Sequence, residues 1–214
     1  MKSNIIIFSD FDGTITKQDV LDDVITKIFS FDIYKKVENE LLTDKLKYED
    51  YLYKMFDGIN YDLNNISTDL IDEYFCIFYE WIINNNVDFF ILSSGFKKII
   101  QHLIPYVDSN LIFGNDVTID ANKWKVILYE ENNKKSINKV EVINKLKKDN
   151  CKTVFIGDGL SDFKVIGNVD YLFCKKYSLL HQKCIDNNSE HIVYDNFNDV
   201  LQKITRLFDK KLNI

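Results

Sequence analysis

Short apolar runs that end abruptly at polar residues most strongly limit how this 214-residue chain can fold. Four of them stand out, at residues 5–8, 87–92, 153–156 and 171–173. Runs of this length, rich in β-branched and aromatic residues, are typical of strands buried on both faces of a parallel sheet. Residues 96–103 and 140–146 instead show the apolar spacing of amphipathic helices. Strands that alternate with helices predict an α/β fold with right-handed crossovers.

A long helical stretch interrupts this alternation after the first strand. Residues 17–81 contain no convincing strand, and their apolar residues recur at helical spacing. Gly58 and Asn60 indicate a turn within the stretch. We interpret it as an inserted all-helical cap domain, which leaves residues 1–16 and 82–214 as the core domain.

A second, smaller insertion is expected between residues 111 and 129. Asn115-Asp116 and Asp120-Ala121-Asn122 are typical turn sequences, and the residues around them favour strands. The sequence therefore predicts a β-hairpin here.

The charge balance limits the kind of partner the chain can bind. The formal net charge is −6 and the isoelectric point is about 5.1. A field of this sign repels nucleic-acid phosphates, and no stripe of Lys or Arg counteracts it. Nucleic acid is therefore not an expected partner. A small phosphorylated metabolite is compatible, because a bound divalent cation inverts the local sign of an acidic cleft.

Cysteines and apolar segments bear on the location of the protein. The four cysteines have neither CxxC spacing nor histidines at zinc-ligand intervals, so we expect reduced, mostly packed thiols. No segment has the apolar length of a signal peptide or of a membrane span. We expect a cytoplasmic protein with no membrane contact. No sequence feature indicates an oligomeric state.

The first chemistry-bearing motif follows the first predicted strand, where residues 10–14 read DFDGT. Asp10 and Asp12 project to the same side of an extended chain. Such a pair can hold a hard cation while one carboxylate attacks and the other transfers a proton. The alternative is a solvated Asp-Gly turn. A calcium loop of the EF-hand type is excluded, because its sixth and twelfth positions would be Ile15 and Leu21.

Two further polar motifs follow the next predicted strands. Ser93 and Ser94 come directly after one strand, where a hydroxyl and main-chain amides can bind an anion, although a serine here can equally cap a helix. Residues 157–162 read GDGLSD after another strand. Asp158 and Asp162 can complete a cation site with the first motif. The structural alternative is a pair of acids favoured by a helix dipole.

Taken together and in this order, the motifs resemble those of the haloacid dehalogenase superfamily of phosphatases. That family combines DxDGT, a strand ending in Ser or Thr, a lysine, and GDGxxD. Lys139 matches the lysine best, because Val142, Ile143 and Leu146 follow it with helical spacing. Lys134 and Lys135 are the competing positions. The resemblance implies a Rossmann-like core with a parallel sheet and a helical cap.

The resemblance also implies covalent catalysis. Asp10 would be the nucleophile and Asp12 the general acid and base. A Mg²⁺ cofactor would be held by Asp10, the main-chain carbonyl of Asp12 and Asp158, with Asp162 in support.

The same resemblance assigns the phosphate-binding groups. Ser93 and Lys139 would bind the transferring phosphoryl oxygens, aided by amides near Gly13 and Ser94. The expected activity is hydrolysis of a small-molecule phosphate monoester.

The position of the helical insertion resembles the type I cap subfamily, which includes phosphoserine phosphatases. The tail, residues 170–175 and 191–201, is similar to a methionine-salvage enol-phosphate phosphatase. Asp19 lies where serine-specific relatives place an acid for the substrate amine, so it is a candidate substrate-binding residue. The only arginine, Arg206, lies near the C-terminus, which disfavours recognition of a serine carboxylate.

Three alternatives stay open besides the salvage-type phosphatase. Phosphoserine phosphatase is the first, and a phosphotransferase that uses the same intermediate is the second. A non-catalytic phospho-acceptor of receiver type is the third, although such a domain is shorter and lacks an equivalent of Asp12.

Overall fold

The computed structural model describes residues 4–43, 45–130 and 137–209. The chain divides into two compact units. The first unit comprises Met1–Lys17, Asp69–Leu92 and Asn138–Ile214. The second comprises Gln18–Thr68 and Ser93–Ile137. Each unit is therefore assembled from segments far apart in the sequence.

A seven-stranded sheet has the strand order β4-β3-β2-β1-β5-β6-β7. The strands are β1 (Ile5–Ser9), β2 (Asp88–Phe96), β3 (Ile112–Asp120), β4 (Lys123–Ile127), β5 (Lys152–Gly157), β6 (Tyr171–Lys175) and β7 (Ile192–Tyr194). β1 pairs in parallel with β2 and β5, β6 pairs in parallel with β5 and β7, and β3 pairs antiparallel with β4. The predicted α/β class with a mostly parallel sheet is confirmed, and all four predicted strands are present.

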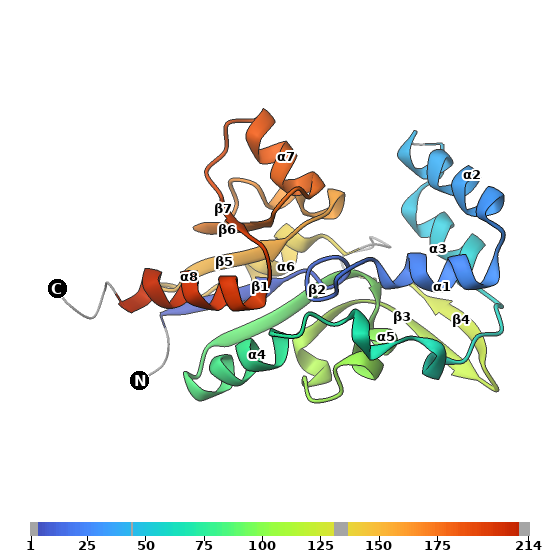
Figure 1. Ribbon diagram of the computed structural model, residues 1–214, viewed down its shortest axis with the longest axis horizontal. Coiled ribbons are helices and arrows are strands. Elements are labelled where there is room, and N and C mark those ends of the chain that lie inside the picture. Colours follow the sequence, from blue (N-terminus) through green and yellow to red (C-terminus); the bar gives the residue numbers. More distant parts are fainter. Residues whose placement is uncertain (1–3, 44, 131–136, 210–214) are drawn as a thin grey trace. The chain divides into compact units, whose positions relative to one another are not determined.

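The first unit buries β1 completely, as its unbroken apolar run requires. Its helices are α4 (Phe75–Asn84), α6 (Lys139–Leu146), α7 (Leu179–Asp186) and α8 (Phe197–Asp209), with a 3₁₀ helix at Leu160–Val165. Figure 1 shows α4 and α8 side by side. Phe197 meets Phe75 and Phe78 of α4 at ring-centroid distances of 5.1 and 5.0 Å. This aromatic cluster anchors the C-terminal helix.

The predicted boundary of the cap at residue 81 falls inside α4. Phe75 and Phe78 also pack on Phe89 of β2, at 6.3 and 6.0 Å between ring centroids. α4 therefore belongs to the first unit, although its apolar residues share the helical spacing of the preceding segment. The cap role of the residues before α4 stays a prediction.

The second unit contains α1 (Val20–Ile28), α2 (Phe31–Leu42), α3 (Tyr48–Phe56) and α5 (Lys97–Leu103), with 3₁₀ turns at Leu63–Asn65 and Ser109–Leu111. A further 3₁₀ turn spans Thr68–Leu70 at the boundary between the units. Helices are present in this stretch as predicted, and so is the turn, where Gly58 adopts a φ of +79°. Trp124 of β4 is buried and stacks on Phe56 at 6.3 Å. The main-chain N–H of Gly58 donates to the Trp124 carbonyl at 2.8 Å.

The predicted hairpin consists of β3 and β4, but only one of its two turn predictions is confirmed. Ala121 and Asn122 form the turn with φ values of +45° and +63°. Asn115 lies within β3, so the turn predicted there is wrong. Its side chain instead accepts from the Tyr129 amide at 2.9 Å and donates to the Ser94 carbonyl at 2.7 Å. The polar residue bridges backbone segments and does not reverse the chain.

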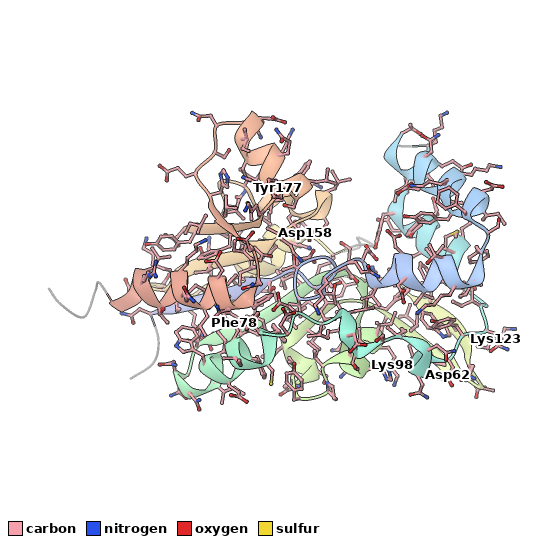
Figure 2. The ribbon with its side chains drawn as sticks, viewed as in Figure 1. Asp62, Phe78, Lys98, Lys123, Asp158 and Tyr177 are labelled. Carbon is pink, nitrogen blue, oxygen red and sulfur yellow. The ribbon has the colours of Figure 1, made fainter. Side chains whose placement is uncertain are left out.

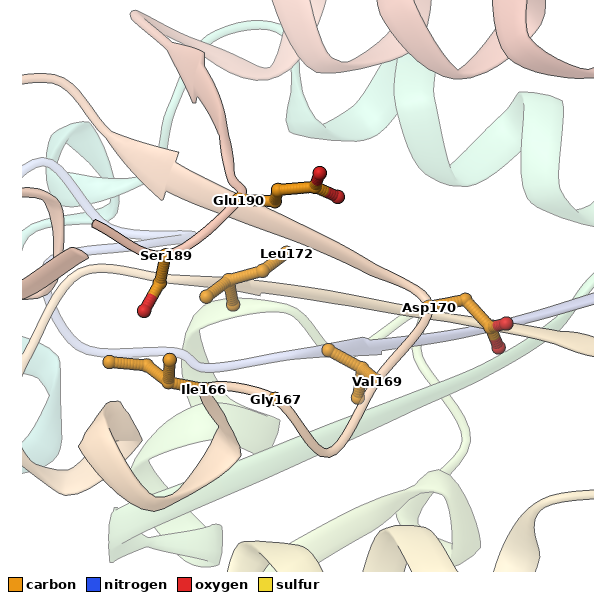
Figure 3. A pocket seen from close by; sticks show the side chains of 7 residues that line it. All are labelled: Ile166, Gly167, Val169, Asp170, Leu172, Ser189 and Glu190. Atoms are coloured by element: carbon orange, nitrogen blue, oxygen red, sulfur yellow. The ribbon is translucent and has the colours of Figure 1, made fainter. Parts of the chain in front are cut away.

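A hollow of about 280 Å³ lies in the first unit, at the amino end of β6. Figure 3 shows its lining, which consists of Ile166, Gly167, Val169, Asp170, Leu172, Ser189 and Glu190. None of these is a predicted site residue. Among the described residues, no helix has the length and apolar character needed to span a membrane.

Candidate active site

The candidate site of the first unit begins at the carboxyl ends of β1 and β5. These strands are neighbours, so the residues that follow them meet at one edge of the sheet. The Asp10 amide continues the pairing by donating to the Ile156 carbonyl at 2.8 Å. The chain then turns tightly, because the amides of Thr14, Ile15 and Thr16 all donate to the Phe11 carbonyl. Asp10 is fixed at the start of this turn and is only 5% exposed.

Three carboxylates converge at this edge. Asp10, Asp158 and Asp162 each offer an oxygen atom, and these atoms lie within 4.8 Å of one another. Asp158 follows β5, and Figure 2 labels it at that position. Asp162 lies in the 3₁₀ helix behind it and is fully buried. Residues separated by about 150 positions in the sequence thus form one acidic cluster.

Lys139 supplies the positive charge of the cluster. It is the first residue of α6 and is 4% exposed. Its Nζ donates to Asp10 Oδ1 at 2.7 Å, to Asp162 Oδ1 at 2.6 Å and to Ser161 Oγ at 3.0 Å. All three ammonium donors therefore have a partner. The competing positions Lys134 and Lys135 lie outside the described residues.

Asp162 links the lysine to the turn that carries Asp158. Its Oδ2 accepts from the amides of Asp158 and Gly159, both at 3.1 Å. A Cβ atom on Gly157 would lie 2.5 Å from the same oxygen, so only glycine fits there. The GDGxxD spacing therefore has a local structural reason, since the second aspartate ties down the backbone around the first.

The first motif is joined to Asp158 through Thr14 and Gly13. Thr14 Oγ1 donates to Asp158 Oδ1 at 2.9 Å. Gly13 has a φ of +73°, and a Cβ atom there would clash with the Asp158 carboxylate. The DxDGT turn and the GDGxxD turn are thus in direct contact, and both the glycine and the threonine are needed for the fit.

Burial strongly perturbs the acids of the cluster. It raises the pKa of Asp10 well above its usual range, and Asp162 and Asp158 add to the rise while Lys139 opposes it. Burial, together with repulsion from Asp162, raises the pKa of Asp158 to about 6. Burial disfavours the ammonium of Lys139, but Asp10 and Asp162 outweigh it, so the pKa of Lys139 is raised. The single positive charge of Lys139 therefore does not fully offset the free-energy cost of ionising the buried acids around it.

The donor set fits a divalent metal ion. Carboxylate oxygens are the ligands that Mg²⁺ and Ca²⁺ prefer, and Mg²⁺ typically uses one or two carboxylates together with substrate phosphate. Burial first, and repulsion between the acids second, raise the pKa of Asp10 and Asp158, and a bound divalent ion would oppose both effects by favouring the ionised acids. Among the described residues, Asp10, Asp158 and Asp162 form the set of acids whose oxygens lie close enough to share an ion.

Asp12 lies in the turn after β1 and is half-buried. Its side chain is not one of the three clustered carboxylates. The role predicted for its main-chain carbonyl as a metal ligand, and for its carboxyl group as an acid and base, stays a prediction.

Ser93 and Ser94 belong to the second unit, within β2. Both were expected just beyond the strand, yet β2 continues to Phe96, which caps α5. Ser93 is buried, and its Oγ accepts from the Gly95 amide at 2.9 Å. Their predicted contacts with a phosphoryl group remain predictions, as does the anion site formed by their amides.

Asp19 caps the N-terminus of α1 in the second unit. Its Oδ1 accepts from the amides of Leu21 and Asp22 at 2.8 and 3.1 Å. Helix capping is a common use of an aspartate at this position. The structure thus gives this carboxylate a local role that is separate from substrate binding.

Sequence reasoning missed two groups that contact the cluster. Ser161 lies between Asp158 and Asp162 in the sequence, and its hydroxyl accepts a hydrogen bond from Lys139. Thr14 was seen only as part of the motif, without its bond to Asp158. Both residues lie within the motifs, so the only sequence feature that could have indicated them is that they are close in the sequence to the predicted site residues.

Comparisons with known proteins place this geometry in a family. No family model matches the chain. It is 26% identical over 225 residues to the 2-hydroxy-3-keto-5-methylthiopentenyl-1-phosphate phosphatase of Bacillus cereus, covering 98% of this chain and all of the relative. It is also 26% identical over 224 residues to Pdp3-interacting factor 1 of Schizosaccharomyces pombe, with 97% of each chain covered. These full-length similarities support a phosphatase of the haloacid dehalogenase superfamily.

A solved structure has a similar fold. A phosphoserine phosphohydrolase-like protein from Francisella tularensis superposes with a TM-score of 0.68 over 95% of this chain and all of that one, at 20% identity. Support for a haloacid dehalogenase phosphatase therefore rests on full-length similarity and on the motifs that meet at the acidic cluster.

Proposed function

We propose that this chain is a magnesium-dependent phosphatase that hydrolyses a small phosphate monoester through an aspartyl-phosphate on Asp10. The observation that carries the proposal is the buried cluster of Asp10, Asp158 and Asp162 around the Lys139 ammonium. Its members come from the motifs by which the superfamily is recognised. The full-length phosphatase relatives support the same reaction class.

Asp10 is the proposed nucleophile. One of its oxygens would form a bond to phosphorus while the bond from phosphorus to the leaving oxygen breaks. Asp12 would give its proton to that leaving oxygen and then take a proton from the water that attacks the aspartyl-phosphate. The second step breaks the bond between Asp10 and phosphorus and releases inorganic phosphate.

Lys139 and Asp162 would prepare the nucleophile. The ammonium lies 2.7 Å from Asp10 Oδ1, so it favours the ionised acid that the attack requires. It also supplies positive charge close to the atom on which the phosphoryl group would be transferred. Asp162 holds the ammonium from the other side at 2.6 Å, which fixes its position.

The metal ligands proposed are Asp10, the main-chain carbonyl of Asp12 and Asp158, with Asp162 in support. When bound, Mg²⁺ would supply charge neutralisation for the phosphoryl oxygens. Thr14 would orient Asp158 for this task, since it already donates to Oδ1 of that carboxylate.

A methionine-salvage type of enol phosphate is the proposed substrate class. The Bacillus cereus relative named for that substrate matches along the whole chain. The single arginine at position 206 also leaves Gln18–Thr68 and Ser93–Ile137 without a guanidinium for an amino-acid carboxylate. Phosphoserine is the second candidate, favoured by the solved phosphoserine phosphohydrolase-like relative.

A phosphate-release screen tests the proposal. Purified protein with Mg²⁺ would be given a panel that includes a methylthio-substituted enol phosphate, phosphoserine and p-nitrophenyl phosphate. We expect turnover that a chelator abolishes, with the enol phosphate preferred. Added alcohols would reveal phosphotransfer as a phosphorylated alcohol. Stable phosphorylation of the protein without turnover would instead favour a receiver-type phospho-acceptor.

A further inference from the structure

A second lysine of the first unit reaches the DxDGT turn from the opposite end of the sequence. Lys175 is the last residue of β6 and is half-buried. Its Nζ donates to the Gly13 carbonyl at 2.6 Å and to the Thr16 carbonyl at 3.3 Å. It therefore hydrogen-bonds to the turn through main-chain atoms, and its charge also acts on Asp158 of the acidic cluster.

The position of β6 makes this contact demanding. β5 lies between β6 and β1, so Lys175 reaches past the end of β5, where Gly13 lies against Asp158, to contact the turn that follows β1. Only a long side chain can reach that far. Burial lowers the pKa of Lys175, although Asp158 and Asp72 oppose the shift. The chain thus keeps a desolvated cation here with two backbone carbonyls as its partners.

The turn also depends on its own hydrogen bonds. The Gly13 amide donates to Thr16 Oγ1 at 2.9 Å, and Thr16 Oγ1 donates to the Phe11 carbonyl at 3.2 Å. These bonds satisfy the inner face of the turn. The carbonyls of Gly13 and Thr16 are the groups that Lys175 satisfies, and bonds to a charged donor are stronger than neutral ones.

A displacement of this turn would be passed on to the reacting groups. Thr14 lies between the two carbonyls that Lys175 holds, and its hydroxyl orients Asp158 at 2.9 Å. Asp10 and Asp12 lie at the start of the same segment. A shift of about 1 Å in catalytic groups can cost roughly 10²-fold in rate.

We propose that Lys175 is a positioning residue of the reaction, which holds the Asp10–Thr16 turn in register with Asp158 through the carbonyls of Gly13 and Thr16. This inference rests on the proposed phosphatase function. It gives the tail segment that contains Lys175 a physical role, because the ammonium hydrogen-bonds to the backbone of the turn that carries the reacting groups.

Two measurements on a Lys175→Met variant test the proposal. Methionine keeps much of the apolar stem and removes the donor. We expect kcat for p-nitrophenyl phosphate with Mg²⁺ to fall about 10- to 100-fold with little change in KM. We also expect faster hydrogen–deuterium exchange at the amides of residues 13–16, which are all hydrogen-bonded in the native turn.

Lys176→Met is the matched control. Lys176 is exposed and pairs with Asp195 at 3.5 Å, so its loss should change neither the rate nor the exchange. Should Lys175→Met fail to fold, Lys175→Arg takes its place. It keeps the charge but alters the length, so kcat should again fall while the melting temperature stays close to that of the wild type.

The results separate this proposal from the proposed function. Normal kcat in the Lys175 variant overturns the proposal, and so does a low kcat with native exchange at residues 13–16. If the wild-type protein turns over no phosphate ester, the phosphatase function fails. The exchange result then still decides whether Lys175 holds the turn.

Discussion

The environment of Lys139 illustrates why single residues dominate this site. Its ammonium is buried between Asp10 and Asp162 and bonds to both. Transferring such charges out of water is costly, and the mutual attraction repays the cost only while every partner is present. The arrangement is therefore better suited to specifying a reactive geometry than to maximising stability.

Removing that ammonium should destabilise the fold. Lys139→Met leaves two buried carboxylates without their cation, and we expect a loss of about 3–5 kcal/mol in the free energy of unfolding. Lys139→Met combined with Asp162→Asn should recover part of this loss, because one of the two acids is then neutral. Urea denaturation of both variants checks the prediction, and equal stabilities would contradict it.

The proposed nucleophile can be tested with an almost isosteric change. Asp10→Asn should remove essentially all turnover, because an amide oxygen cannot form the aspartyl-phosphate. The fold should persist, since Asn can still accept from Lys139. Steady-state phosphate release and circular dichroism measure the two outcomes. Asp149→Asn, at an exposed position, is the control. Activity retained by the Asp10 variant would assign the nucleophile elsewhere.

The tight turns of the chain constrain the site as strongly as its charged groups. Gly13 and Gly58 have similar φ values of +73° and +79°. A Cβ atom on Gly13 would clash with Asp158, whereas one on Gly58 meets nothing within 4 Å. Substituting each glycine in turn therefore distinguishes the effect of backbone strain, common to both positions, from steric interference with the candidate site, which occurs only at Gly13.

This contrast gives a paired prediction. Gly13→Ala and Gly58→Ala should each cost about 1–2 kcal/mol from the left-handed backbone alone. Only Gly13→Ala should also abolish activity and weaken Mg²⁺ binding, because the added methyl group displaces the Asp158 carboxylate. Thermal unfolding and isothermal titration calorimetry measure the two effects. Normal Mg²⁺ binding by Gly13→Ala would contradict the assignment of Asp158 as a ligand.

The sequence predicts the strands that carry the site but gives no sign of β7. The run at residues 5–8 is continuous and apolar, so its burial follows from composition. β7 is only three residues long and has no pattern that could reveal it. β2 extends through Ser93 because β3 lies close beside it, and a Cβ atom on Gly114 would be 2.8 Å from the Ser93 carbonyl. Such close backbone packing leaves no periodic signal.

Contacts across the sequence were predictable only where a family pattern named them. Lys139 was favoured from the helix that follows it, and its bond to Asp10 spans 129 positions. Lys175 was visible only as part of a similar tail segment, and no spacing rule indicated its bond to Gly13. Three-dimensional packing determines which groups a long side chain contacts on a neighbouring segment, and the periodicity of a sequence does not encode this.

At the level of the chain, the two compact units differ from the predicted domains. Contacts group residues 93–137 with the helices of residues 18–68, whereas α4 joins the sheet and α8. The helical spacing of residues 75–84 resembles that of the preceding segment, so periodicity alone could not separate them. The aromatic partners of α4 come from β2 and the C-terminal helix, which decides its membership.

The metal-free protein should respond to pH through Asp158. Its pKa is about 6 in the fold against 3.8 for the free side chain. The folded state therefore binds more protons between these values, and its stability should fall as pH rises from about 4 to about 6. Added Mg²⁺ should reduce this dependence by favouring the ionised acid. Melting temperatures measured with chelator and with Mg²⁺ check this, and identical pH profiles would contradict it.

The central claim is that Asp10 carries the phosphoryl group between two half-reactions. The most direct test starts the reaction with Mg²⁺ and substrate and stops it within milliseconds. Borohydride then reduces the acyl phosphate, and mass spectrometry maps the modified peptide. We predict a modification at Asp10 that disappears in the presence of chelator and in Asp10→Asn. Steady turnover with no modified Asp10, or with the phosphoryl group on another residue, would contradict the account.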